Sequence, residues 1–231
     1  MAFTAAQVMK SASTILQDDG SVRWTAPELR TYLNDGLREL VTIKPNAKTV
    51  TTTISLASGT KQELPDQYTI LSRVVCNRIA GNSKAIRPLA KREIMDAQIP
   101  DWQSTNGLPF AAGVTHVIHD LSDPRTFYVV PGNNGTGQIE VVVGAIPTPV
   151  PVPGSDVLAI ESYTANVDAP DIYQNALMHY VLYAAFSKDA GIPGAGQRAA
   201  AHLELFRSGV TGFGAAESAM SVAAQAMRPQ G

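Results

Sequence analysis

Four histidines are the side chains in this sequence best suited to acid–base chemistry near neutral pH, because an unperturbed imidazole has a pKa of about 6.5. His116 and His119 precede Asp120, so a hydrolase could find a base and a carboxylate partner here. Residues 116–119 have the pattern of a strand, however, and positions three apart in a strand face opposite sides of the sheet. We therefore do not expect the two histidines to ligate one metal ion. A hydrolase using His116 or His119 is kept only as a minor alternative.

The other acid–base candidates also have structural interpretations. Asp120 and Asp123 are close in sequence, but residues 121–124 have the composition of a turn in which Asp accepts local hydrogen bonds. His179 and His202 fall in segments with helical spacing, where we expect packed histidines rather than ligands. No catalytic group is predicted from these residues.

Patterns that bind phosphates or activate nucleophiles are missing from the sequence. The glycine-rich stretches 132–137 and 191–196 lack the Lys-Ser/Thr of a phosphate loop and the strand–turn–helix context of a dinucleotide site. No serine lies in a nucleophile elbow. Cys76 is the single cysteine, which excludes an internal disulfide and a cysteine-based metal site. We predict that the protein is not an enzyme and that it takes no cofactor or metal.

Charge is sparse and unevenly distributed. Only 16% of the 231 residues are charged, below the usual value of about a quarter, and the net charge is −2. Such a composition suits a subunit that buries much of its surface by oligomerisation, and it does not favour non-specific binding to nucleic acid. The stretch 73–92 is basic and contains no acid. Its bases are Arg73, Arg78, Lys84, Arg87, Lys91 and Arg92.

Two interpretations of the basic stretch are open: a solvated strand face with its turn, or a polar contact to a partner protein or to DNA phosphate.

The sequence begins without the basic-then-apolar layout of a signal peptide, and no apolar run approaches the ~20 residues that span a bilayer. We expect a soluble protein made in a reducing cytoplasm that does not bind membranes.

Helical patterns lie on both sides of a region with strand patterns. Apolar spacing predicts helices over residues 4–16, 26–42, 168–189 and 197–208. Two of them begin alike, because Thr25 and Asp168 each supply an N-cap oxygen, followed by a first-turn proline and an acid. Apolar residues flank each start at the spacing of a hydrophobic staple. Gly36 interrupts its helix and predicts the close approach of a neighbouring backbone.

The middle of the chain alternates between apolar and polar residues. Strands are predicted over 49–56, 62–65, 69–79, 85–89, 116–119, 126–130 and 138–143, with a short helix over 91–99. Residues 132–135 (Gly-Asn-Asn-Gly) predict a hairpin between the last two strands. Four prolines within residues 147–153 predict an extended connector.

These patterns predict an α+β fold, in which a bundle of about four helices carries an inserted, mostly antiparallel β-domain and a flexible C-terminal tail. The predicted segments are 1–47 (first half of the helical domain), 48–165 (inserted β-domain), 166–208 (second half of the helical domain) and 209–231 (C-terminal docking tail). The tail is rich in Gly, Ala and Ser, so we expect it to become ordered only against a partner. Its apolar anchors are Phe213, Met220, Val222 and Met227.

Several short segments, taken in order and spacing, resemble the tailed-bacteriophage head-to-tail adaptor (connector) proteins, in a podovirus-like form. The resemblance covers about residues 20–208. Its pieces are Trp24-Thr25, 28–40 (ELRTYLNDGLREL), 44–47 (KPNA), 62–65 (QELP), 86–88 (IRP), 100–102 (PDW), 127–131 (FYVVP), 180–190 (YVLYAAFSKDA), His202 and Phe206.

The resemblance implies a structural virion protein in the neck, assembled in the bacterial cytoplasm as a homo-oligomeric ring, with twelve subunits the expected number. The ring would join the portal to a tail or nozzle protein and leave an axial channel through which DNA passes without sequence-specific binding. The C-terminal segment would dock on the portal through the four apolar anchors of the tail. Polar partner contacts are expected from Arg73, Arg78, Arg87, Lys91 and Arg92. Another phage neck or tail-completion protein is the alternative.

Overall fold

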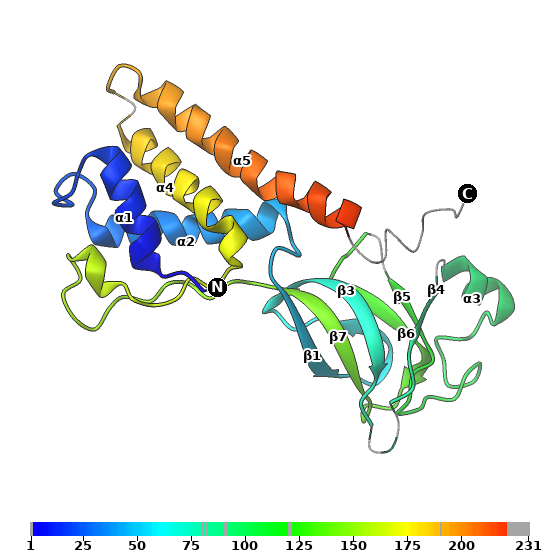
Figure 1. Ribbon diagram of the computed structural model, residues 1–231. Helices are drawn as coiled ribbons and strands as arrows, with labels where there is room; N and C mark the ends of the chain where they lie inside the picture. Colours follow the sequence, from blue (N-terminus) through cyan, green and yellow to red (C-terminus); the bar gives the residue numbers. More distant parts are fainter. Residues whose placement is uncertain are drawn as a thin grey trace. The chain divides into compact units, whose positions relative to one another are not determined.

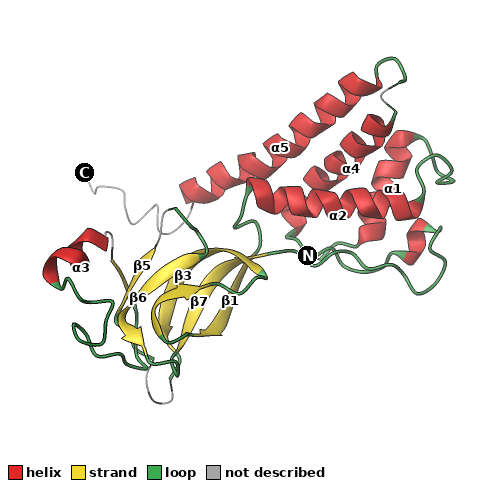
Figure 2. Ribbon diagram, turned by 180° about the vertical axis from the view of Figure 1, so that it is seen from behind, coloured by secondary structure: helices red, strands yellow, loops and turns green. Residues whose placement is uncertain are grey.

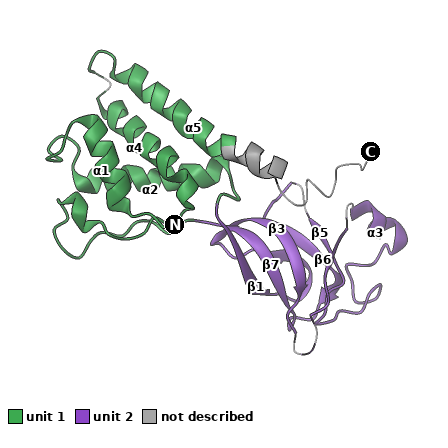
Figure 3. Cartoon of the chain, in the orientation of Figure 1, with its two compact units in different colours: residues 1–47, 147–231 green, residues 48–146 purple. Residues whose placement is uncertain are grey.

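The computed structural model describes residues 2–79, 81, 83–89, 92–119, 122–189 and 191–220, with side chains described up to residue 212. The chain divides into unit 1, residues 1–47 with 147–231, and unit 2, residues 48–146 (Figure 3). Unit 1 is helical and unit 2 contains the strands, which confirms the predicted α+β class.

The helices of unit 1 pack around α4. Its elements are α1 (Ala5–Leu16), α2 (Ala26–Ile43), the 3-10 turns η1 (Ile160–Ser162) and η2 (Asp171–Tyr173), α4 (Gln174–Lys188) and α5 (Ala195–Met220) (Figure 1). Helix α4 packs against α1, α2 and α5. It therefore buries apolar residues on several sides, including Leu177, Val181, Leu182 and Ala185, all at 0% exposure.

The two helix starts that look alike in sequence differ in structure. Thr25 is the N-cap of α2, with Pro27 and Glu28 in the first turn as predicted, although the Thr25 side chain makes no capping hydrogen bond. The start predicted at Asp168 is wrong, because α4 begins only at Gln174, after a 3-10 turn. The Asp168 carboxylate instead accepts a 2.7 Å hydrogen bond from the Thr148 N–H, so it holds the incoming chain and does not cap a helix.

Two glycines allow close helix packing in unit 1. A Cβ on Gly36 of α2 would lie 3.0 Å from the Tyr180 ring of α4, so the predicted close neighbour is a side chain. A Cβ on Gly209 of α5 would lie 3.2 Å from the Ala176 Cβ at the start of α4. Both positions therefore fix how near a helix can approach α4.

The segment 147–165 belongs to unit 1, whereas we predicted it as part of the inserted β-domain. Val150 is 1% exposed, and both of its backbone groups are held by Asn34: the Val150 N–H donates to Oδ1 at 2.7 Å and the carbonyl accepts from Nδ2 at 3.3 Å. Arg30 Nε also donates to the Val150 carbonyl, at 2.8 Å. The proline-rich connector is therefore clamped to α2 and leads back into the helical core.

Helix α5 also differs from the prediction, because it continues to Met220 and does not end near residue 208. Val210 is fully buried and Gly209 contacts α4, so the residues just after 208 pack within the protein. This packing offsets the cost of about 1 kcal/mol that a glycine brings to a helix interior. The predicted flexible tail is thus helical up to Met220, and residues 221–231 lie outside the described residues.

Unit 2 consists of two sheets that face each other (Figure 2). Its strands are β1 (Thr49–Ser55), β2 (Gly59–Glu63), β3 (Tyr68–Asn77), β4 (Arg87–Leu89), β5 (His116–His119), β6 (Thr126–Asn133) and β7 (Gln138–Ala145). One sheet has the order β1-β7-β3 and the other β2-β6-β5-β4, and every pair is antiparallel except β4 with β5. Buried residues from both sheets form one core, which includes Val74, Phe127, Val129 and Val141.

The hairpin predicted between β6 and β7 is wrong, because these strands belong to different sheets. The linking segment turns around Asn133, whose side chain is 0% exposed. Its amide group donates to the Ala111 and Ala112 carbonyls, and its Oδ1 accepts from the Gly135 and Gly137 N–H groups at 2.8 and 3.1 Å. These bonds direct the chain around a corner from one sheet to the other.

A second apolar cluster covers the outer face of the β4-containing sheet. Helix α3 (Arg92–Gln98) and the segment after it place Met95 and Trp102 against Ile118 and Val130. The Trp102 indole N–H donates to an Asp96 carboxylate oxygen at 2.8 Å. Both faces of this sheet are therefore packed.

Candidate interaction surfaces

Helix α5 is held on α4 along its first four turns. Its inward residues Ala195, Ala199, Phe206 and Val210 are all buried. The Phe206 ring lies 5.0 Å from the Tyr180 ring in an edge-to-face arrangement, a favoured aromatic geometry. The two helices run antiparallel and are of unequal length, because α4 has 15 residues and α5 has 26.

Because α5 is the longer helix, its last turns extend beyond the N-terminal end of α4. Gly209 contacts Ala176, the third residue of α4, so the last turns of α5 extend past the start of its partner helix. Phe213 and Met220 lie in those last turns, in the stretch of α5 of which only the backbone is described. Val222 and Met227 lie outside the described residues. The structure thus places two of the four docking candidates on one helix.

Two of the predicted basic contacts are engaged within unit 2. Arg78 forms an ion pair with Glu140 of β7, and the Cys76 thiol lies 3.7 Å from the same carboxylate. Arg92 is the first residue of α3, and its guanidinium lies over the rings of Tyr128 and Trp102, 5.0 and 5.9 Å from their centroids. Such cation–π contacts fix the side chain against the sheet.

Arg73 and Arg87 are exposed, as is Arg78 beside its ion pair with Glu140. Arg73 and Arg87 lie on β3 and β4, which meet where the Ile86 N–H donates to the Val75 carbonyl at 3.2 Å. Among the described residues, neither guanidinium lies within 4.0 Å of a carboxylate. Lys91 falls outside the described residues. Of the five predicted basic contacts, Arg73, Arg78 and Arg87 are therefore exposed, and Arg78 is paired with Glu140.

The histidines of β5 lie on opposite faces of the sheet, as predicted. Val117 packs in the core between the sheets and Ile118 in the cluster around Trp102, so His119 and His116 flank different layers. Burial lowers the pKa of His119. Asp120 is outside the described residues. Within the described stretches of the chain, no three His, Cys, Asp or Glu side chains are grouped closely enough to hold a metal ion.

Asp123 forms the turn that the sequence predicted. Its carboxylate accepts from the Thr126 hydroxyl at 2.7 Å and from the Arg125 N–H at 3.0 Å. These two hydrogen bonds lower the pKa of Asp123. The side chain therefore has a structural role beside β6.

Sequence reasoning missed a contact between the other two histidines. His179 of α4 and His202 of α5 face each other, with 3.1 Å between their Nδ1 atoms. The Phe186 ring lies parallel to His202, with the planes 5° apart and the centroids 5.6 Å apart. No sequence signal pairs residues that are 23 positions apart on different helices; only the antiparallel packing of α4 and α5 brings them together.

A polar network at the far end of α4 was also not predicted. Lys188 forms an ion pair with Glu28 at 2.8 Å, and Arg23 forms one with Asp189 at 2.7 Å. The Tyr32 hydroxyl donates to Glu28 at 2.9 Å. Burial, and then the hydrogen bond to Glu28, raise the pKa of Tyr32. These contacts join the start of α2 to the end of α4.

Comparison with known protein families identifies the family of this chain. The model of the SU10 adaptor protein family matches residues 3–229. No curated protein matches the chain. Within the described residues, no helix is both long and apolar enough to cross a membrane. Because the family match spans almost the whole sequence, the chain belongs to the SU10 adaptor protein family, a family of phage head-to-tail adaptors.

Proposed function

We propose that this protein forms a homo-oligomeric ring, of twelve subunits, that joins the portal to a tail or nozzle protein and leaves an axial channel for DNA. The family has a structural role in the virion neck, in association with portal and tail components. Our proposal specifies how this protein would perform that role. The ring assembles in the bacterial cytoplasm. The observation that carries the proposal is the family match over residues 3–229.

The composition supports assembly. A chain with 16% charged residues has fewer charges to desolvate when subunits pack side by side. Its net charge of −2 gives little overall attraction to DNA, which suits a channel that must release its contents. Arg73 and Arg87 are exposed and supply polar contacts to a partner protein.

The length of α5 supports portal docking by the C-terminal segment. The helix extends past the start of α4, and its last turns carry Phe213 and Met220, followed in sequence by Val222 and Met227. These four apolar residues come after the contact between α4 and α5 in the sequence, so they could pack against the surface of another protein.

Two truncations test this docking. Ending the chain after Gly212 keeps the contacts of Gly209 and Val210 but removes all four docking candidates, so the fold should persist and portal binding should be lost. Ending it after Met220 removes only Val222 and Met227 and should weaken binding less. Affinity for purified portal, measured with circular dichroism as the folding control, gives the readout. If the chain that ends after Gly212 still bound the portal normally, the docking surface would have to lie elsewhere in the protein.

The alternative assignment, another neck or tail-completion protein, is separated by position. Density of the intact particle should show this subunit directly beneath the portal. Density for the subunit only at the distal side of the neck would favour the alternative.

A further inference from the structure

The α4–α5 contact contains a pair of histidines that share a hydrogen bond. The Nδ1 atoms of His179 and His202 are 3.1 Å apart, whereas the ring centroids are 5.2 Å apart. Because the two Nδ1 atoms are closer together than the two ring centroids, each Nδ1 atom lies on the side of its ring that faces the other histidine. Both side chains are half-buried between the helices.

Such a pair can hold only one proton between its facing nitrogens. One Nδ1–H donates and the other Nδ1 accepts through its lone pair. When both rings are cationic, both Nδ1 atoms carry a proton, so the hydrogen bond is lost and two positive charges face each other in a half-buried site, where they repel strongly. The packed arrangement of α4 and α5 therefore requires that at least one facing nitrogen stays unprotonated.

The surroundings offer nothing to neutralise a second proton. Among the described residues, no carboxylate lies within 4.0 Å of either ring. On α5, the Arg198 guanidinium lies 5.7 Å from the Phe186 ring centroid. On α2, Asp35 and Glu39 act on Tyr180.

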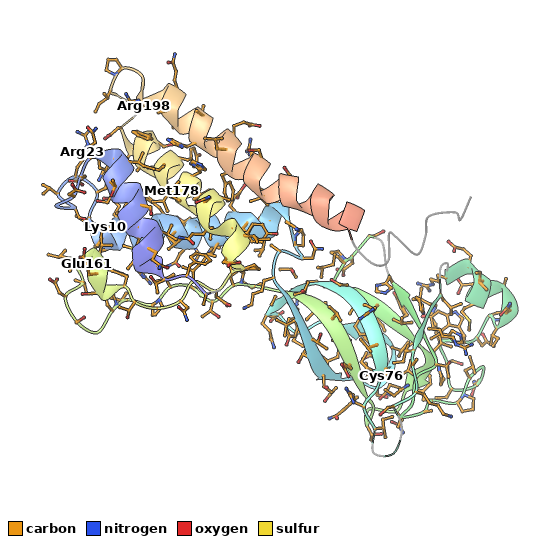
Figure 4. The ribbon with its side chains drawn as sticks, in the orientation of Figure 1. Lys10, Arg23, Cys76, Glu161, Met178 and Arg198 are labelled. Carbon is orange, nitrogen blue, oxygen red and sulfur yellow. The ribbon has the colours of Figure 1, made fainter. Side chains whose placement is uncertain are left out.

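Helix α1 adds a single ionisable side chain, Lys10, which pairs with Glu161 at 3.5 Å (Figure 4). Up to residue 212, where the description of side chains ends, the remaining ionisable groups of the two paired helices are Tyr180, Tyr183, Lys188, Glu204 and Arg207. None of these is hydrogen-bonded to either histidine. The charge on the pair is thus set by its own protons.

We propose that the His179–His202 pair is an acid-sensitive latch, which holds α5 on α4 at neutral pH and releases it when both rings become protonated. The sign follows from linkage. Burial lowers the pKa of both rings, and for His202 the charge of His179 lowers it further, so the opened helix binds more protons than the packed one. The latch is therefore closed above the ordinary histidine pKa of 6.5 and weakens as the pH falls below it.

Amide hydrogen exchange of the full-length protein tests the latch. Protection of α5 amides in the stretch 199–210, corrected for intrinsic exchange, should fall by about tenfold or more between about pH 7.5 and about pH 5, since one linked proton changes the equilibrium by up to about tenfold per pH unit. His202→Asn keeps a polar group near the Nδ1 position without a titrating ring. Its α5 protection should change less than about twofold over the same range.

His116→Asn is the matched control, because it removes a histidine from unit 2 and should leave the pH response of α5 as in the unmodified protein. The same pH dependence in His202→Asn and in the unmodified protein would overturn the latch. So would α5 protection that follows pH no more than the amides of β7 do.

Nitrogen-15 NMR of the histidine rings in the unmodified protein tests the latch without a substitution. The pair should titrate in two separate steps, with the second step coinciding with the loss of α5 protection. Two independent titrations at the ordinary histidine pKa, with no shared Nδ1 proton, would contradict it. Both readouts use the isolated protein, so they do not depend on whether it binds the portal.

Discussion

The two units of this protein are built from different stretches of chain, and each unit is stabilised internally by a different set of contacts. Unit 2 is continuous, 48–146, and its sheets enclose one apolar core with Asn133 at the corner. Unit 1 is assembled from 1–47 and 147–231, so its two stretches must be joined after a long excursion. Polar contacts make those joints: Asn34 with Val150, Lys188 with Glu28, and Arg23 with Asp189.

Within unit 1, apolar and polar contacts therefore have different roles. The apolar residues of α1, α2, α4 and α5 supply most of the burial, whereas the polar contacts select which segment returns to which helix. Substitutions in unit 1 that remove a buried apolar contact should therefore cost more stability than those that remove a polar contact.

Phe206→Ala should cause the largest loss. The ring is 0% exposed and packs against Tyr180, so its removal leaves a cavity and should cost about 3–5 kcal/mol of unfolding free energy in unit 1. Leu205→Ala is the matched control on the same helix, since Leu205 is 48% exposed, and it should cost under about 0.5 kcal/mol. Denaturant unfolding followed by segment-resolved exchange measures both. Equal losses would mean that α5 does not pack as described.

Asn34→Ala tests the joint between α2 and the returning chain. It leaves the buried Val150 N–H without its acceptor, which should cost about 1–3 kcal/mol of unfolding free energy. Asn34→Asp keeps the Oδ1 acceptor for that N–H and should cost less. Guanidinium titration compares the two variants. If alanine and aspartate behave alike, the clamp on Val150 contributes no selectivity.

Gly36→Ala and Gly212→Ala should change stability in opposite directions. A methyl group on Gly36 would meet the Tyr180 ring at 3.0 Å and should destabilise unit 1 by about 1–3 kcal/mol. Gly212 has open space, so alanine there should stabilise α5 by up to about 1 kcal/mol. Thermal unfolding distinguishes the signs. A stabilising Gly36→Ala would show that α2 and α4 lie further apart.

Glu28→Gln should have the smallest effect at neutral pH. Burial by itself would raise the pKa of Glu28, but hydrogen bonds from Lys188 and Tyr32 outweigh it and leave the pKa below its usual value of 4.5. The stabilisation is therefore present above pH 4.5 and is lost as the pH falls through the lowered pKa.

Because Lys188 is partly exposed, we expect a loss of only about 0.5 kcal/mol near pH 7. The loss should vanish near pH 3, as measured by urea unfolding at both pH values. A difference that persists at low pH would assign the effect to packing. Asp35→Asn, which breaks an exposed pair with Arg38, is the control and should be neutral.

The sequence predicted the local elements well because their signals are local. Periodicity located the helices and the strands, and Thr25 with Pro27 marked the start of α2 correctly. The start predicted at Asp168 failed because the carboxylate has a tertiary partner, the Thr148 N–H, that no local pattern reveals. The hydrogen bond from Thr148, which is distant in sequence, therefore replaced the local capping role predicted for Asp168.

The predicted hairpin and the helix end predicted at residue 208 were wrong for related reasons. Gly-Asn-Asn-Gly is typical of a tight turn, but the side chain of Asn133 is buried by contacts from residues 111 and 112, which direct β7 to the other sheet. The composition after residue 208 is poor in apolar residues, yet Val210 is buried, Gly209 contacts α4, and α5 continues to Met220. The histidine pair depends on the same helix packing and was equally hidden.

Native mass spectrometry of the purified protein mixed with its portal tests the adaptor account most directly. We predict a discrete complex in which one closed ring of twelve identical subunits is bound to each portal. A protein that remains monomeric and leaves the portal mass unchanged would contradict the account.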